Sequence, residues 1–207
     1  MTLIIDLDHL LIRTEGLKVK MFELVKPLGV TRKIFNETYQ TIVHRAQGKY
    51  SYNAVIHGKK MAAALKKPAL ASEITERLYQ AIEQTPNLVY GDVFDFLDKA
   101  RKSRALMILL TRGDPDWQKR KIKAAGLKKF FNQIIITPLD KSKILRQRAN
   151  LSKPVYLITD NAQEIERLRK IKVTILQLIR PEGKYRKKAP GVKVVQTLKQ
   201  AWTIIAR

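Results

Sequence analysis

The sequence predicts an α/β protein, a doubly wound parallel sheet that an all-helical segment interrupts. Residues 3–7 form a short apolar run, residues 15–87 show only helical periodicity, and after residue 88 short apolar runs alternate with helical patterns. Alternating strands and helices are typical of a parallel sheet that helices cover on both faces. We therefore expect a core domain of residues 1–14 and 88–207, and an inserted helical domain of residues 15–87.

The insert contains four stripes of apolar residues spaced three or four apart, which predict about four helices. These stripes begin at Leu17, Ile34, Val55 and Ile74. Proline and glycine residues, at positions where helices usually break, separate them. We expect no strand in this segment.

The remainder of the core pattern predicts five more strands and five helices. The expected strands cover residues 105–110, 134–136, 155–158, 173–176 and 192–195. The expected helices cover residues 93–103, 117–125, 142–149, 162–171 and 198–205. Reactive groups in such sheets gather at the carboxyl ends of the strands. The polar residues that follow each apolar run are therefore the candidates for a site.

The composition excludes several classes of protein. There is no cysteine, which excludes disulfides, thiolate catalysis and cysteine-ligated metals. The three histidines, His9, His44 and His57, are too few for a histidine-rich metal site. The sequence contains no apolar run of about 18 residues, so it predicts no membrane span. The first residues do not resemble a secretory leader. We expect a cytoplasmic protein without a membrane partner.

Positive charge is concentrated in the second half of the chain. The protein has 41 Lys and Arg against 18 Asp and Glu, a formal net charge of +23. Residues 93–207 hold 28 basic and 9 acidic side chains, a net of +19, and residues 1–92 hold 13 and 9, a net of +4. Such a field attracts anions, so non-specific binding of nucleic acid or another polyanion is one interpretation. A solvated lysine surface that keeps the protein soluble is the other.

Charged and hydroxyl side chains follow four of the apolar runs. Asp6 and Asp8 follow the first run, Thr111 and Arg112 the second, Lys141 the third, and Asp160 the fourth, with Glu164 four residues later. Two carboxylates at i and i+2 of an extended segment point the same way, so one can act on a substrate and the other on its leaving group. Carboxylate oxygens suit Mg²⁺, and hydroxyl and ammonium groups stabilise phosphate oxygens. The pattern predicts phosphoryl-transfer chemistry.

Taken together, these segments resemble the four motifs of the haloacid dehalogenase (HAD) superfamily. Residues 3–11 are similar to the first motif, residues 109–113 to the second, Lys141 to the third, and residues 157–160 with Glu164 to the fourth. Gln118, Lys121 and Gly126-Leu127 also match the helix typical of the hydrolase branch. The resemblance spans the whole chain in the right order. It implies a Rossmann-like core with an inserted helical C1 cap that covers the active site and selects substrates.

The resemblance also implies catalytic and metal-binding roles. Asp6 would be the nucleophile that forms an aspartyl-phosphate. Asp8 would be the general acid, and then the base that activates water. Mg²⁺ would bind Asp6, the backbone carbonyl of Asp8, and Asp160, with Glu164 in support.

Phosphate binding is assigned by the same resemblance to Thr111, Arg112 and Lys141. Lys143 is an alternative to Lys141, because it lies only two residues later. Arg112 would contribute either its guanidinium or only its backbone.

Two positions depart from the pattern of the superfamily. Leu10 stands where Thr or Val is usual, and Thr159 stands where Gly is common. Leu10 keeps its backbone N–H, and we expect Thr159 to narrow the metal loop slightly. Neither departure removes a catalytic carboxylate.

The expected activity is Mg²⁺-dependent hydrolysis of a small phosphomonoester. Asp8 favours this activity, because the dehalogenase branch lacks an aspartate at that position. A phosphomutase, which also uses both aspartates, is an alternative, and so is a nucleic-acid-binding protein on the same scaffold. The sequence does not identify the substrate or the oligomeric state. Polar residues near the helix ends of the cap that would select the substrate are His44, Arg45, Tyr50, Tyr52 and His57.

Overall fold

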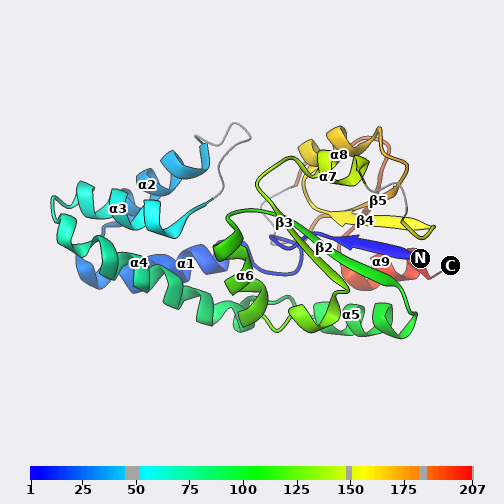
Figure 1. Ribbon diagram of the computed structural model, residues 1–207, viewed down its shortest axis with the longest axis horizontal. Coiled ribbons are helices and arrows are strands. Elements are labelled where there is room, and N and C mark those ends of the chain that lie inside the picture. The colour runs from blue at the N-terminus through cyan, green and yellow to red at the C-terminus, as the bar shows by residue number, and fades with distance from the viewer. Residues whose placement is uncertain (45–51, 148–150, 182–185, 207) are drawn as a thin grey trace.

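Six strands form a single parallel sheet in the computed structural model, which describes residues 1–44, 52–147, 151–181 and 186–206 (Figure 1). The strand order is β3-β2-β1-β4-β5-β6. The strands are β1 (Thr2–Ile5), β2 (Leu106–Arg112), β3 (Gln133–Thr137), β4 (Val155–Thr159), β5 (Thr174–Leu178) and β6 (Lys193–Val195). The predicted α/β fold with a parallel sheet is confirmed.

The surroundings of the central strand β1 explain why apolar residues do not alternate with polar residues in the apolar runs. Ile4 pairs in register with Ile108 of β2 and Leu157 of β4. All four residues of β1 are fully buried, because helices cover both faces of the sheet. Strand β2 continues two residues beyond the predicted end at Leu110, and this extension places Thr111 inside the end of the strand.

Five helices of the core cover the two faces of the sheet. They are α5 (Val93–Lys102), α6 (Pro115–Ala124), α7 (Lys141–Arg146), α8 (Ala162–Leu168) and α9 (Leu198–Ile205). One apolar cluster joins Leu3 and Ile5 to α5, α6 and α9, and another joins Ile4 to α7 and α8. Helix α8 ends three residues before its predicted end. The last residues of the helix predicted at 142–149 lie outside the described residues.

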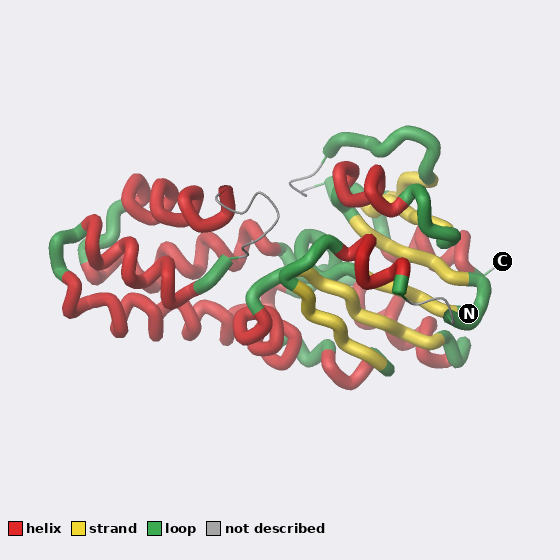
Figure 2. Tube along the Cα trace, turned by 45° about the horizontal axis from the view of Figure 1, so that its top comes forward, coloured by secondary structure: helices red, strands yellow, loops and turns green. Residues whose placement is uncertain are grey.

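The helical insert comprises the elements from α1 to η3. Its α-helices are α1 (Thr14–Val25), α2 (Arg32–His44), α3 (Ala54–Ala64) and α4 (Ala71–Gln80), and its 3₁₀ helices are η1 (Lys26–Leu28), η2 (Pro68–Leu70) and η3 (Ala81–Leu88). It has its own apolar cluster, distinct from the two clusters of the sheet. Figures 1 and 2 show that it extends away from one end of the sheet.

Trp117 joins the two parts of the molecule. It lies on α6 of the core, yet its buried side chain belongs to the apolar cluster of the helical insert. Its ring lies 4.7 Å from that of Tyr52 and 5.9 Å from that of Tyr79, between ring centroids. The helical insert is therefore packed directly beside the start of α6. Among the described helices, none is both long and apolar enough to cross a bilayer.

Candidate active site

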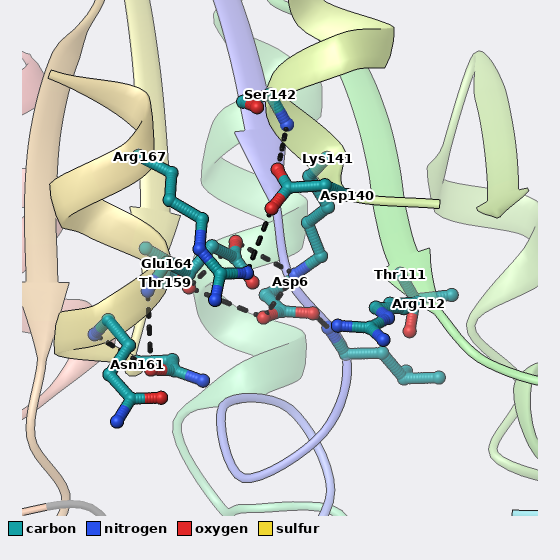
Figure 3. A network of polar contacts seen from close by, with 12 residues as sticks. Asp6, Thr111, Arg112, Asp140, Lys141, Ser142, Thr159, Asn161, Glu164 and Arg167 are labelled. Carbon is teal, nitrogen blue, oxygen red and sulfur yellow. Dashed lines mark hydrogen bonds and ion pairs between the residues drawn. The ribbon is translucent and has the colours of Figure 1, made fainter. Parts of the chain in front are cut away.

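Most of the residues predicted for the site meet at one edge of the sheet. Figure 3 shows this for Asp6, Thr111, Arg112, Lys141 and Glu164. This convergence follows from the parallel topology, because the carboxyl ends of all the strands lie at the same edge. Asp6 follows β1, Thr111 and Arg112 end β2, Lys141 opens α7, Asp160 follows β4, and Glu164 lies on α8.

Asp6 is buried and held by three donors. The backbone N–H of Leu7 donates to its Oδ1 at 2.8 Å. The Nζ of Lys141 lies 2.6 Å from Oδ2, and the hydroxyl of Thr159 lies 3.3 Å from the same oxygen. These contacts fix the carboxylate of Asp6 at the end of β1, with a cation beside it.

Lys141, and not Lys143, is the lysine of this site. Its side chain is only 3% exposed, and its Nζ also lies 3.1 Å from Oε1 of Glu164. Burial would lower the pKa of Lys141, but the charges of Asp6 and Glu164 outweigh burial and raise that pKa above its usual value. Lys141 is therefore fully protonated. Lys143 lies on the exposed side of α7.

Asp8 faces α6, on the other side of the site. Its Oδ1 forms an ion pair with Lys121 and accepts a hydrogen bond from Thr14, and its Oδ2 accepts one from Gln118 at 2.8 Å. Burial alone would raise the pKa of Asp8. The charge of Lys121 and the hydrogen bonds from Lys121, Gln118 and Thr14 prevail, and they lower the pKa to about 2. Asp8 is therefore ionised at neutral pH.

Gln118 connects Asp8 to the end of β2. Its Nε2 lies 2.8 Å from the hydroxyl of Thr111 and 3.2 Å from the backbone oxygen of Arg112. A Cβ atom on Gly113 would lie 2.5 Å from the Cγ of Gln118, so glycine at this position leaves room for the amide. The buried hydroxyl of Thr111 is therefore oriented toward the same amide that holds Asp8.

The predicted role of Arg112 is compatible with its placement. Its side chain is partly buried, and Figure 3 shows it pointing toward Asp6. It also lines a cleft together with Asp8. Both its backbone oxygen and its guanidinium thus face the site.

Asp160 and Glu164 are the two acidic residues contributed from beyond β4. Burial, and then the charge of Asp6, raise the pKa of Asp160 to about 8. Burial is also the main cause of the raised pKa of Glu164, although Lys141 opposes it. Oδ2 of Asp160 is buried and has no hydrogen-bond partner in the described structure. A buried carboxylate oxygen without a donor is costly unless a cation or a proton compensates it.

The donor atoms at this edge fit a magnesium ion. Mg²⁺ is commonly bound by one or two carboxylates together with water and substrate phosphate. Asp6 and Asp160 supply two carboxylates, and the unpartnered oxygen of Asp160 is an available ligand. The described residues contain no group of three acidic, histidine or cysteine side chains arranged for a metal. Glu164 instead contacts Lys141 and Thr159.

Four residues make contacts at the site that the sequence does not predict. Gln118 and Lys121 match a helix of the superfamily for which the resemblance implies no role, and Thr14 lies outside the four motifs. All three hold the carboxylate of Asp8. Thr159, expected only to narrow the metal loop, places its hydroxyl between Asp6 and Glu164. The one available signal was that Gln118 and Lys121 are i and i+3 on a helix, and so share a face.

A cleft of about 200 Å³ opens from Asp8 toward the helical insert. Tyr52, one of the residues predicted to select the substrate, lines it. His57 does not, because its side chain is fully buried behind Tyr52. Arg45 and Tyr50 lie outside the described residues, as does the side chain of His44.

Solved structures with the same architecture cover almost the whole chain. The magnesium-bound HAD-hydrolase YfnB from Bacillus subtilis has a TM-score of 0.72 at 13% identity, covering 100% of this chain and 98% of its own. A protein described as a β-phosphoglucomutase, from Thermotoga maritima, has a TM-score of 0.69 at 15% identity, with 100% and 99% covered. L-2-haloacid dehalogenase from Xanthobacter autotrophicus, with chloropropionic acid covalently bound, has a TM-score of 0.67 at 14% identity, with 99% and 98% covered.

No protein-family model matches the sequence, and neither does any curated protein. The structural similarity nevertheless confirms the predicted fold. The chain has the HAD-like architecture, an α/β sheet with a helical insert after the first strand. The similar structures include a hydrolase, a mutase and a dehalogenase, so the activity has to be argued from the site itself.

Proposed function

We propose that the protein is a Mg²⁺-dependent phosphatase that hydrolyses a small phosphomonoester through an aspartyl-phosphate on Asp6. The observation that carries this proposal is the pair of carboxylates at the end of β1, which occupy different environments. Asp6 is paired with Lys141 at the edge of the sheet, and Asp8 is oriented toward α6 and the cleft. Two carboxylates with separate partners suit a nucleophile and a proton-transfer group.

In the first step, Asp6 attacks the phosphorus atom and displaces the leaving group. Lys141 lies beside the carboxylate of Asp6 and neutralises part of the charge on the phosphate. The hydroxyl of Thr111 and the guanidinium of Arg112 bind the phosphate oxygens from β2. Bound Mg²⁺, held by Asp6, the backbone carbonyl of Asp8 and Asp160, would supply further positive charge to the phosphate.

Asp8 transfers the proton in both steps. An incoming phosphate carries negative charge, which raises the pKa of Asp8 above its value of about 2 in the free protein. The proton that Asp8 takes up then passes to the oxygen of the leaving group. In the second step the carboxylate accepts a proton from the water that attacks the acyl-phosphate bond, which restores Asp6.

Hydrolysis of 4-nitrophenyl phosphate tests the nucleophile. Asp6→Asn should lower kcat by at least about a thousandfold with Mg²⁺ present, because an amide is not a competent nucleophile. Asp98→Asn is the matched control, since Asp98 is a half-exposed residue of α5 paired with Arg101. Equal rates for wild type and Asp6→Asn would refute the assignment. Chelation of the metal should abolish the activity of the wild type.

A mutase is distinguished by where the phosphoryl group goes. A phosphatase releases one inorganic phosphate for each substrate consumed. A mutase would instead give an isomeric phosphate ester, with little free phosphate. Measuring both products from the same reaction separates the two activities.

Polyanion binding is a second candidate function, and a groove on the opposite edge of the sheet favours it. Arg146, Lys153, Lys170 and Lys172 line this groove of about 340 Å³, with no acidic side chain among its lining residues. The groove lies where β4 and β5 begin, so it is remote from the catalytic edge, where they end. Within the described part of the chain these four cations have no ion-pair partner.

Binding to a single-stranded oligonucleotide tests this candidate. The affinity should fall steeply between 50 and 200 mM salt, as expected when phosphate contacts release counterions. Replacing the four cations of the groove with Gln should weaken binding more than replacing four exposed lysines of the helical insert. Suitable controls are Lys26, Lys33, Lys59 and Lys67. Equal losses would show that only total charge matters and would refute a groove-specific role.

A further inference from the structure

A cleft between the helical insert and the core adjoins the carboxylate of Asp8. It begins at Asp8, the group proposed to protonate the leaving oxygen, and its walls come from α1, α2, Tyr52 just before α3, the end of β2 and α6. Residues of the cleft therefore contact the leaving group and decide which phosphomonoester fits. This inference rests on the proposed function and specifies its substrate.

Most polar groups of the cleft already have partners within the protein. Oδ1 of Asp114 accepts from the backbone N–H of Trp117, and its Oδ2 accepts from the amide of Asn53, both at 3.0 Å. Asp8 is held by the three donors described above. The hydroxyl of Thr14 is engaged with Asp8 and with the backbone N–H of His9. Groups in such contacts offer few new hydrogen bonds to a ligand.

Gln118 also offers few hydrogen bonds to a ligand. Its Nε2 is shared among three acceptors. Its Oε1 has no partner in the described structure, but the atom is buried and cannot reach a ligand. A leaving group rich in hydroxyls would lose hydrogen bonds to water here without replacing them. A sugar phosphate is therefore a poor fit, because its hydroxyl groups would be left without partners in the cleft.

Aromatic side chains supply much of the remaining wall. Tyr39 and Tyr52 line the cleft with their rings 5.3 Å apart, and Trp117 lies 4.7 Å from Tyr52. The hydroxyl of Tyr52 is 3.0 Å from Nδ1 of His57. Because the backbone oxygen of Phe35 can only accept, Nε2 of His57 carries its hydrogen and Nδ1 accepts from Tyr52. Tyr52 therefore presents its ring to the cleft while its hydroxyl is occupied behind it.

Lys18 provides a positive charge at the side of the cleft formed by the helical insert. Its Nζ lies 4.6 Å from the centroid of the Tyr39 ring, and its side chain is partly buried. Among the described residues it has no carboxylate partner, whereas Lys121 of the same cleft is paired with Asp8. A partly desolvated cation beside an aromatic wall can bind the acidic end of a flat ligand.

We propose that the substrate is an aryl phosphomonoester that carries a second anionic group, with its ring against Tyr39, Tyr52 and Trp117 and its anion on Lys18. Phosphate at Asp6 and a carboxylate at Lys18 would fix the two ends of the molecule. The ring between them would replace water against the aromatic walls and would require no further hydrogen bonds.

Two isosteric substrates test the role of Lys18. Wild-type protein should hydrolyse 4-carboxyphenyl phosphate with a kcat/KM about fivefold or more above that for 4-carbamoylphenyl phosphate, the size expected for one partly buried charge pair. In Lys18→Met this ratio should fall to about one, and in Lys18→Glu it should invert. Lys20→Met is the matched control, because Lys20 lies on the same helix, does not line the cleft and is paired with Glu23. Its ratio should equal that of the wild type.

A polyol substrate separates this inference from the proposed function. If glucose 6-phosphate is hydrolysed with a kcat/KM equal to or above that of the aryl substrates, the inference is overturned while the phosphatase assignment stands. An unchanged ratio in Lys18→Met also overturns it. The circular dichroism spectrum of each variant shows whether it is folded.

Product binding provides a test that needs no turnover. Calorimetry should detect 4-hydroxybenzoate binding to the wild type and to Lys20→Met, and binding at least about fivefold weaker to Lys18→Met. Such binding in a protein that hydrolyses no phosphomonoester would support the cleft assignment and refute the phosphatase. Absence of binding to the wild type would refute the cleft assignment.

Discussion

The ammonium group of Lys141 lies 2.6 Å from the carboxylate of Asp6 and 3.1 Å from that of Glu164, and it is almost completely buried. One cation thus compensates two carboxylates that come from different elements, the end of β1 and helix α8. This arrangement joins the nucleophile proposed for the reaction to the acidic residues beyond β4. Several consequences can be measured.

Replacing Lys141 should affect both stability and activity. Without added metal, Lys141→Met should lower the free energy of unfolding by roughly 3 kcal/mol, because it leaves buried carboxylates without their counter-charge. It should also abolish most phosphatase activity. Lys143→Met should change stability by less than about 0.5 kcal/mol, as expected for an exposed site. Urea unfolding and steady-state kinetics measure the two effects, and similar behaviour of the two variants would contradict the assignment of Lys141.

Gly113→Ala should impair activity through Gln118. The new Cβ atom would displace the side chain of Gln118 from Asp8 and Thr111, so we expect kcat/KM to fall about tenfold to a hundredfold. Stability should change little, because the displaced group is a flexible side chain. The double variant Gly113→Ala/Gln118→Ala should be no worse than Gln118→Ala alone, since both changes remove the same contacts. Additive losses would show that Gly113 acts independently of Gln118.

His57 should make stability depend on pH. Burial, with a smaller effect of Lys18, lowers the pKa of His57 from 6.5 to about 4. Below pH 6.5 the unfolded state therefore binds a proton at His57 that the folded state does not bind. The contribution of His57 to the stability of the folded protein is at its full value above pH 6.5 and is lost as the pH falls toward 4. Between pH 7 and pH 5 the wild type should lose about 2 kcal/mol that His57→Gln does not lose. Urea unfolding of both proteins at the two pH values gives the difference, and equal pH dependence would show that His57 does not titrate in this way.

Gly58 should be required for the packing of α3 against α4. A Cβ atom there would collide with the side chain of Thr75 and lie 2.9 Å from the backbone oxygen of Ala71. Because backbone cannot move aside easily, Gly58→Ala should destabilise the protein by about 1–3 kcal/mol despite its better helix propensity. Gly91→Ala is the control, since a Cβ atom there would have nothing within 4 Å. It should be neutral or slightly stabilising in urea unfolding. A neutral Gly58→Ala would indicate that α3 and α4 are less tightly packed.

The sequence predicted the fold correctly because its patterns are local. Buried parallel strands give continuous apolar runs, such as residues 106–110, whereas the helices of the insert give apolar residues spaced three or four apart. Boundaries were predicted less well. Strand β2 extends two residues beyond its predicted end, to Arg112, and α8 ends at Leu168, three residues before its predicted end.

Only part of the site could be predicted. Topology brings Asp6, Thr111, Lys141 and Asp160 to one edge, and topology follows from the order of the strands. The choice of Lys141 over Lys143 depends on which face of α7 meets β1. The motif favours Lys141 and leaves Lys143 as an alternative, and the structure places Lys141 beside Asp6.

The sequence by itself determined which reactive side chains meet at the site, because the carboxyl ends of parallel strands lie at the same edge of the sheet. Tertiary structure decided how these side chains are arranged. Gln118 and Lys121 reach Asp8 across more than 100 residues of sequence, and Lys18 meets the cleft only because the helical insert packs on α6. Such contacts depend on the packing of whole elements, which no local pattern records.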